Sequence, residues 1–255
     1  MYSLLEYGAM AGDRARMHAF EKALAQTVRP GDLVLDLGAG PAIFSMIACR
    51  LGAAHVHAVD PDASLLLGME LARANSWQDR ITFHRKLSRD VTLPHRADVV
   101  VSDLRGVLPL FGTHIPAIID ARERLLAPGG VLIPQRDVVM AALVDNAELH
   151  SGFERPWLEN ELGVDLRAGY GYTSNQWQRA HLEPHHLATQ ARPWAALDYR
   201  TVDSPNAAGT VEWTIETPRT VHGVAMWFDC ELGGNAAFSN APGSGVLTYR
   251  QAFFP

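Results

Sequence analysis

Apolar residues in the first half of the chain follow two alternating spacings. Short apolar runs, typical of buried strands, predict strands over residues 33–37, 55–59, 81–84, 98–102 and 130–134. Between these runs, apolar residues three and four positions apart predict helices over residues 13–28, 42–51, 62–75 and 114–126. Strands and helices that alternate in this way predict an α/β fold with a doubly wound, mostly parallel sheet.

The pattern changes after Pro128-Gly-Gly130, which favours a helix stop and a turn. Strand-like runs follow at Val211–Thr217, Val221–Glu231 and Gly245–Phe254, so the second half is predicted to be mostly β. Residues from about 146 to 186 are rich in Trp, Tyr, His and Glu without a clean period. We interpret part of this segment, at about residues 165–190, as an arm or insertion.

Composition narrows the class of protein. A net charge of −6 and the absence of a basic run argue against a nucleic-acid partner, because phosphate binding depends on clustered Lys and Arg. No apolar run reaches the length of a membrane span, and no basic segment with an apolar core begins the chain, so we expect a cytoplasmic protein without membrane contact. Cys49 and Cys230 fall in predicted elements and are expected to be buried reduced thiols.

The stretch Val34-Leu-Asp-Leu-Gly-Ala-Gly40 carries the strongest functional pattern. Gly38 and Gly40 let the backbone turn off a strand and approach a ligand closely, and Asp60 ends the next strand, where its carboxylate can accept both ribose hydroxyls. Position 43 is Ile where a dinucleotide site has its third glycine, and Asp36 is the acidic residue that methyltransferases carry in this turn. We therefore predict binding of S-adenosylmethionine, with S-adenosylhomocysteine as the product.

The segment from Tyr7 to Arg16 resembles the N-terminal segment of the protein arginine methyltransferases, with Met10, Asp13 and Arg16 at matching positions. Leu125–Pro134 is similar to that family's entry into its C-terminal half, and Thr248-Tyr-Arg-Gln251 is similar to an altered form of its Thr-His-Trp loop. The resemblance implies that Met10 packs on the cofactor, that Arg16 pairs with the cofactor carboxylate, and that Tyr7 contacts the cofactor. It also places Arg89 where the family has an acidic adenine contact, so Ser88 is expected to share that role.

The resemblance implies two parts: residues 1–134, a cap helix and a Rossmann-like domain that binds S-adenosylmethionine, and residues 135–255, a shortened, barrel-like β-rich subdomain. The second part would carry a helical arm and serve substrate binding and dimerisation, so a homodimer is expected.

The loop that holds the acceptor in that family is altered here. It begins Ser-Glu-Trp-Met-Gly in the family and carries a second Glu some nine residues later, whereas this chain has Ser102-Asp-Leu-Arg-Gly106 and Gly112. Asp103 replaces the first Glu, Gly112 the second, and Arg105 adds a positive charge. A cationic guanidinium would lose its carboxylate pair, and loss of a desolvated charge pair costs several kcal/mol, or about a thousandfold in affinity.

Asp103 is the first candidate for the polar catalytic role because it ends a parallel strand on the cofactor side of the sheet. His114, in the same altered loop, is the second, although most histidines are solvated or packed in cores. Candidates for acceptor contact are Arg105, Tyr172, Trp177, His181, Thr248 and Tyr249. The two aromatic residues of the arm segment are equally compatible with local core. No ligand set accompanies His185 and His186, so no metal is predicted.

These observations favour a methyltransferase that acts on a small, neutral natural-product acceptor. We expect this acceptor to be aromatic or to contain an indole, as a tryptophan-derived compound does, and to be methylated at carbon or nitrogen. One alternative is protein arginine N-methylation with Asp103 as the guanidinium contact. Another is a non-catalytic homologue that serves as a dimeric binding or regulatory subunit.

Overall fold

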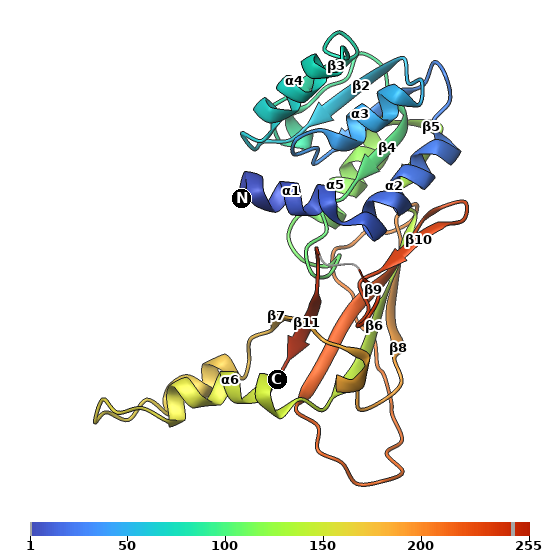
Figure 1. Ribbon diagram of the computed structural model, residues 1–255. Helices are drawn as coiled ribbons and strands as arrows, with labels where there is room; N and C mark the ends of the chain where they lie inside the picture. The colour runs from blue at the N-terminus through green and yellow to red at the C-terminus, as the bar shows by residue number, and fades with distance from the viewer. Residues whose placement is uncertain (1, 246–247) are drawn as a thin grey trace.

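The computed structural model describes residues 2–245 and 248–255. The first half forms a five-stranded parallel sheet in the order β3-β2-β1-β4-β5 (Figure 1). Its strands are β1 (Leu33–Leu37), β2 (His55–Val59), β3 (Ile81–His84), β4 (Ala97–Ser102) and β5 (Leu126–Ile133). The helices of this half are α1 (Leu4–Gly12), α2 (Arg14–Thr27), α3 (Ile43–Arg50), α4 (Leu65–Ala74) and α5 (His114–Asp120), with 3₁₀ turn η1 (Ser88–Asp90) and π-helical turn η2 (Ala121–Leu125).

The predicted strands of this sheet agree with the structure because each is an apolar run buried on both faces, as parallel strands require. β1, β2 and β3 have the predicted bounds, and β4 begins one residue earlier. β5 begins at Leu126 instead of residue 130, since Ala97 pairs with Leu126 while Val99 pairs with Val131. The intervening Pro-Gly-Gly residues therefore bulge within a strand instead of only ending a helix.

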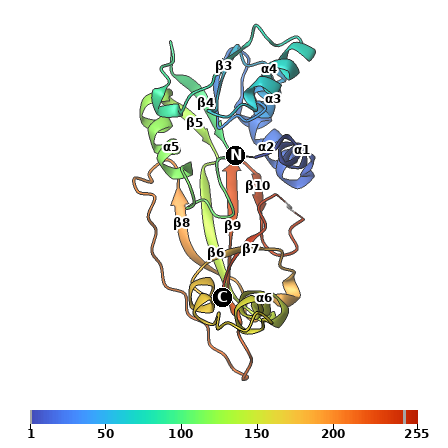
Figure 2. The ribbon, with the colours of Figure 1, turned by 90° about the vertical axis from the view of Figure 1, so that its left-hand side faces the viewer.

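The second half forms a six-stranded antiparallel sheet in the order β7-β11-β9-β6-β8, with β10 paired to β9. The strands are β6 (Arg136–Val144), β7 (Gln178–Ala180), β8 (Arg192–Asp198), β9 (Gly223–Gly233), β10 (Ala236–Ser239) and β11 (Gln251–Phe254). Figure 2 shows the parallel sheet and its helices at one end of the molecule and this sheet at the other. The fold is thus a Rossmann-like domain followed by a β-rich subdomain with helices.

Two of the expected strands in this half are corrected. Residues 211–217 form no strand and are largely exposed, because no neighbouring strand pairs with them; Trp213 Nε1 instead donates to the backbone oxygen of Gln190. The strand expected over 245–254 is limited to β11, and residues 246–247 lie outside the described part of the chain. β6, which was not expected from the sequence, is a nearly continuous apolar run inside the sheet, between β9 and β8.

Helices α6 (Ala147–Leu158) and α7 (Ala168–Thr173) project away from both sheets (Figure 1). This arm lies earlier in the chain than the expected residues 165–190, because residues 178–180 form β7 within the sheet and residues 184–186 form the 3₁₀ turn η3 (Pro184–His186). Tyr172 in the arm is 75% exposed, so it does not cover local core.

Helix α2 joins the two halves. Its Phe20 is fully buried, stacks on Phe44 of α3 with ring centroids 4.5 Å apart, and lies 5.8 Å from the ring of Phe238 in β10. One aromatic side chain thus packs against both domains and holds α2, the helix that carries Arg16. Over residues 2–245 and 248–255, none of the helices has the length and apolar character needed to cross a membrane.

Candidate active site

The glycine turn after β1 brings the backbone against two side chains of the site. Gly38 and Gly40 have φ values of 74° and 51°, in the left-handed region that disfavours side chains. A Cβ at Gly38 would lie 2.2 Å from Cδ2 of Leu104, and a Cβ at Gly40 would lie 2.6 Å from Cε1 of Tyr7. The turn therefore requires glycine at both positions, for conformation and for space.

Asp60, at the end of β2, ties the second strand to this turn. Its Oδ2 accepts from the backbone nitrogen of Gly40 at 2.8 Å, and its Oδ1 accepts from the backbone nitrogen of Asp62 at 2.8 Å. Each carboxylate oxygen has further lone pairs, and the side chain lines two cavities. Asp60 thus stands where a pair of ribose hydroxyls can donate to it.

Asp36, predicted as a residue of the cofactor-binding turn, binds Ser45 behind the turn and does not line a cavity. Its Oδ2 accepts from the backbone nitrogen and Oγ of Ser45 at 2.9 and 2.7 Å, so it holds α3 against β1. Burial raises the pKa of Asp36 to about 7, although the Ser45 hydrogen bonds oppose the change. The side chain lines neither cavity beside the turn, so it supports the turn from behind.

Two adjoining cavities, of about 270 and 520 Å³, share Tyr2, Tyr7, Gly38, Asp60 and Leu104 as lining residues. Met10 and Arg16 line the smaller one, whereas Ser88 and Arg89 line the larger one. The shared Asp60 carboxylate at the junction suits the ribose, the larger cavity suits the adenine, and the smaller one suits the methionine part. The residues present therefore fit S-adenosylmethionine.

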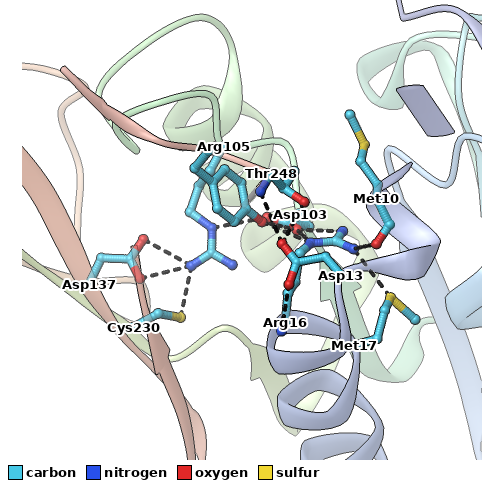
Figure 3. A network of polar contacts seen from close by, with 10 residues as sticks. Met10, Asp13, Arg16, Met17, Asp103, Arg105, Asp137, Cys230 and Thr248 are labelled. Carbon is cyan, nitrogen blue, oxygen red and sulfur yellow. Dashed lines mark hydrogen bonds and ion pairs between the residues drawn. The ribbon is translucent and has the colours of Figure 1, made fainter. Parts of the chain in front are cut away.

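Asp103, at the end of β4, lies in a buried polar network (Figure 3). Its Oδ2 accepts from Arg16 Nε at 2.7 Å, forms an ion pair with Arg16 Nη2 at 2.6 Å, and also accepts a hydrogen bond from the Tyr249 hydroxyl. Its Oδ1 accepts from Arg105 Nε at 3.1 Å. Both oxygens thus have cationic donors from within the protein.

Arg105 carries the network across to the second sheet. Its Nη1 donates to Asp137 Oδ1 at 2.9 Å and to Cys230 Sγ at 2.8 Å, and its guanidinium lies 5.1 Å from the ring centroid of Phe228. The Arg105 side chain is fully buried. Tyr199 Oη completes the network by donating to Asp137 Oδ2 at 2.5 Å. The guanidinium expected to face the acceptor is therefore a link between the two sheets, although Arg105 also lines the smaller cavity.

The network favours the ionised form of Asp103. Burial alone would raise the pKa of this carboxyl, but the charges of Arg16 and Arg105 and the Tyr249 hydrogen bond outweigh burial and lower it. A carboxylate with a lowered pKa and both oxygens occupied is a poor general base. It is equally poorly placed to receive a guanidinium from outside.

His114 is not placed to act as the expected second catalytic group. The side chain is fully buried at the start of α5, packs edge-on against Tyr199 at 5.1 Å between ring centroids, and lines neither of the two cavities. Burial, aided by the charge of Arg105, lowers its pKa to about 3. Neither ring nitrogen has a hydrogen-bond partner among the described residues. A neutral imidazole in apolar packing cannot exchange protons with an acceptor in the cavity.

The remaining acceptor candidates separate into two groups. Tyr249 is buried and bonded to Asp103 and Arg16, and Thr248 donates from its backbone nitrogen and Oγ1 to Asp13 Oδ2 at 3.0 and 2.7 Å. Trp177 stacks on Phe111, which lines the smaller cavity, with ring centroids 4.5 Å apart. Tyr172 and His181 are exposed and line neither cofactor cavity, and His181 pairs with Glu183 instead.

Several residues of the site were not predicted from the sequence. Leu104 and Phe111 line the smaller cavity from the altered loop, and Asp137 holds Arg105 from β6. Asp137 had a sequence signal, since a carboxylate at the start of a long apolar strand must find a buried partner. Within residues 2–245 and 248–255, no group of three or more His, Cys, Asp or Glu side chains is arranged to hold a metal ion.

Comparisons with known proteins agree with this geometry. Residues 19–155, more than half of the chain, match the family model described as ribosomal protein L11 methyltransferase (PrmA). The chain is 27% identical over 237 residues to a probable protein arginine N-methyltransferase 6.2 of Oryza sativa subsp. indica, covering 88% of this chain and 59% of that protein. It is 28% identical over 242 residues to a probable protein arginine N-methyltransferase 6 of Arabidopsis thaliana, covering 89% and 54%.

Among solved structures, the Trypanosoma brucei PRMT1 enzyme-prozyme complex with AdoHcy matches with a TM-score of 0.83 at 20% identity, over 96% of this chain and 80% of that one. At this identity the likeness concerns the fold. The chain spans a little over half the length of the two plant relatives.

Proposed function

This chain belongs to the family of the ribosomal protein L11 methyltransferase (PrmA) model and is a protein arginine methyltransferase-like, S-adenosylmethionine-dependent methyltransferase of class I; from this premise we propose that the group that accepts the methyl is neutral. One observation carries the proposal. The carboxylate that stands where the family holds a guanidinium, Asp103, already receives Arg16 and Arg105. A neutral acceptor needs no free carboxylate.

The cofactor supplies, when bound, a methyl group on a positively charged sulfur. Asp60 accepts the ribose hydroxyls, and Arg16, at the wall of the smaller cavity, offers a cation to the carboxylate of the methionine part. Gly38 and Gly40 give the backbone its close approach to the ligand. These residues hold the donor so that the remaining space, at Phe111 and Gly112, receives the acceptor.

Methyl transfer draws much of its rate from alignment of the two reacting atoms. The two groups expected to act as bases are both unsuited, since Asp103 is a stabilised carboxylate and His114 is buried outside the two cavities. The acceptor atom must therefore be nucleophilic in its neutral form, as an amine nitrogen or an electron-rich ring carbon is, and its proton leaves to solvent. Phe44 and Phe111 give the smaller cavity apolar walls that suit a planar ring.

Protein arginine is the second candidate, and it is the acceptor that the names of the relatives support. None of the relatives cited above is named for an indole or another small aromatic acceptor. Arginine methylation here requires Asp103 to release one of its buried arginines on substrate binding. A non-catalytic regulatory subunit has less support, because the cofactor residues are intact and the family is one of enzymes.

The cofactor step is tested by calorimetry with S-adenosylhomocysteine. We expect micromolar binding by the wild-type chain, no binding by Asp60→Ala, and unchanged binding by Asp79→Ala, which removes an exposed carboxylate of a distant turn. Failure of the wild-type chain to bind would overturn the assignment of the cavities.

The acceptor is tested by transfer of a radioactive methyl group to two probes. An arginine-rich peptide represents the cationic acceptor and N-acetyltryptophanamide represents the neutral aromatic one. Labelling of the peptide alone establishes arginine methylation and refutes the neutral acceptor; labelling of the amide alone supports the proposal. We also propose a homodimer through the arm, and light scattering that gives the monomer mass would refute it.

A further inference from the structure

A third cavity, of about 360 Å³, opens beside the cofactor cavities between α1, β7 and the residues before β11. Tyr2 and Met10 line both this cavity and the smaller cofactor cavity, so the two spaces meet at α1. Its charged lining residues are Glu6, Asp13, Arg179 and Arg250. We refer to it as the arginine cavity.

The two acidic side chains of the arginine cavity are engaged locally. Glu6 accepts from the backbone nitrogen and Oγ of Ser3 at 2.7 and 2.9 Å, as the cap of α1. Asp13 caps α2 by accepting from the backbone nitrogen of Arg16, and it also accepts from Thr248. Both carboxylates thus have partners that fix the fold.

The two arginines of this cavity differ from its acidic residues in their hydrogen bonding. Within the described part of the chain, neither the Arg179 nor the Arg250 guanidinium forms a hydrogen bond or an ion pair, and both side chains are exposed. Glu6 and Asp13 balance the charge of the two arginines, so the cavity has no net charge. The two carboxylates already accept hydrogen bonds, whereas the two guanidinium groups have no acceptor among the described residues. Such a pair has the donor geometry that matches the two oxygens of a carboxylate or a phosphate.

The backbone holds these arginines in a fixed relation. Arg179 lies in β7 and pairs with Ala252 of β11, and Arg250 lies two residues before Ala252. The backbone oxygen of Arg250 accepts from Nδ2 of the fully buried Asn240 at 2.5 Å. Arg250 also has a φ of 56°, a left-handed conformation that is uncommon for a residue with a side chain. An arginine kept in this conformation, where glycine or asparagine would be less strained, points to use of its guanidinium.

We propose that the arginine cavity binds an oxyanion of the acceptor, a carboxylate or a phosphate, while the atom to be methylated passes Met10 into the cofactor cavity. The inference rests on the proposed function and gives its acceptor a further property, a negative charge remote from the neutral reacting atom.

The experiment measures binding to the full chain saturated with S-adenosylhomocysteine, so that cofactor binding is verified in every sample. Three probes distinguish the source of the charge: N-acetyltryptophan carries a carboxylate, phenyl phosphate carries a phosphate, and N-acetyltryptophanamide is neutral. The variants are Arg179→Gln and Arg250→Gln. Arg192→Gln is the matched control, because it removes an exposed arginine of β8, at the opposite edge of the same sheet.

We expect at least one anionic probe to bind about tenfold more tightly than the amide, and each cavity variant to weaken that binding by about three- to tenfold. The control should change it by less than twofold, and cofactor affinity should stay the same in all variants. The inference is overturned if neither anionic probe binds more tightly than the amide, or if neither binds at all. It is also overturned if Arg192→Gln weakens binding of the anionic probe as much as the cavity variants do. Loss of cofactor binding in the wild-type chain would instead refute the proposed function.

Discussion

The Nη2 atom of Arg16 lies 2.6 Å from Oδ2 of Asp103, and this ion pair joins the first turn of α2 to the end of β4. The two side chains are 9% and 4% exposed. Removal of one partner of a buried ion pair leaves a desolvated charge and costs about 3–5 kcal/mol. Because Arg105 shares the same carboxylate, the pair is part of a charge network on which the arrangement of the two sheets depends.

Substitution Asp103→Asn should therefore lower stability first and activity only as a consequence. We expect the free energy of unfolding to fall by about 3 kcal/mol, since Arg16 and Arg105 both lose their shared anion. Urea unfolding at pH 7.5 measures this, with Asp79→Asn as an exposed control. The KM for the acceptor should be unchanged in the fraction that stays folded. A large rise in KM with unchanged stability would instead make Asp103 an acceptor ligand.

His114→Phe should stabilise the protein without loss of methyl transfer. The variant keeps a ring against Tyr199 and removes two buried nitrogens that lack partners among the described residues. A histidine whose pKa is about 3 in the folded chain and near 6.5 when unfolded costs stability as the pH falls from about 6.5 toward 3. The variant should thus gain about 2 kcal/mol more at pH 5 than at pH 7.5.

Unfolding by urea at these two pH values gives the difference, and His114→Leu is a smaller replacement if the larger ring is not accommodated. The kcat of both variants should stay within about twofold of wild type. A fall in kcat of a hundredfold or more, the usual contribution of a general base, would show that His114 takes part in proton transfer.

The parallel sheet was predictable from sequence because each of its strands is a local apolar run. β1 and β2 even have their predicted bounds. The second sheet was less accessible, since its strands pair over long distances. Residues 211–217 have strand composition but no partner, whereas β7 is three residues long and exists because β11 pairs with it. Whether a short segment becomes a strand there depends on its neighbours, which the local sequence does not state.

Some residues of the site likewise have a local sequence signal, whereas others depend on distant parts of the chain. Gly38, Gly40 and Asp60 were identified because a turn with left-handed residues and a carboxylate after a strand are local features. The structural role of Arg105 was not identified, because its partners Asp137 and Cys230 are 32 and 125 residues away along the chain. The sequence shows a positive charge in the acceptor loop, but only the packing of the two sheets shows that this charge points into the interface between them.

Gly112→Glu should give the chain affinity for a guanidinium. Gly112 lines the smaller cavity and a Cβ placed on it meets nothing within 4 Å, so a longer side chain has room. Its φ of 69° makes any side chain cost about 1 kcal/mol. We expect an arginine-rich peptide to bind about tenfold more tightly to Gly112→Glu than to Gly112→Gln, which carries the same backbone strain without the charge. Equal binding by the two variants would place residue 112 outside the acceptor path.

Asp36 should make the wild-type protein less stable as the pH rises from about 4 to 7. Its carboxyl has a pKa of about 7 in the folded chain, so folding favours the protonated form, and the stability that this proton contributes is lost as the pH rises through that range. Asp36→Asn imitates the protonated carboxyl and keeps an oxygen for the backbone nitrogen of Ser45. The variant's advantage in unfolding free energy should therefore grow by about 1.4 kcal/mol per pH unit up to pH 7 and stay constant above it.

Urea unfolding of both proteins at pH 5, 6, 7 and 8 measures the difference, in which the opposing effects of His57 and His114 cancel because both proteins contain them. A difference that does not change with pH would mean that Asp36 is ionised throughout, held so by a charge interaction at the glycine turn.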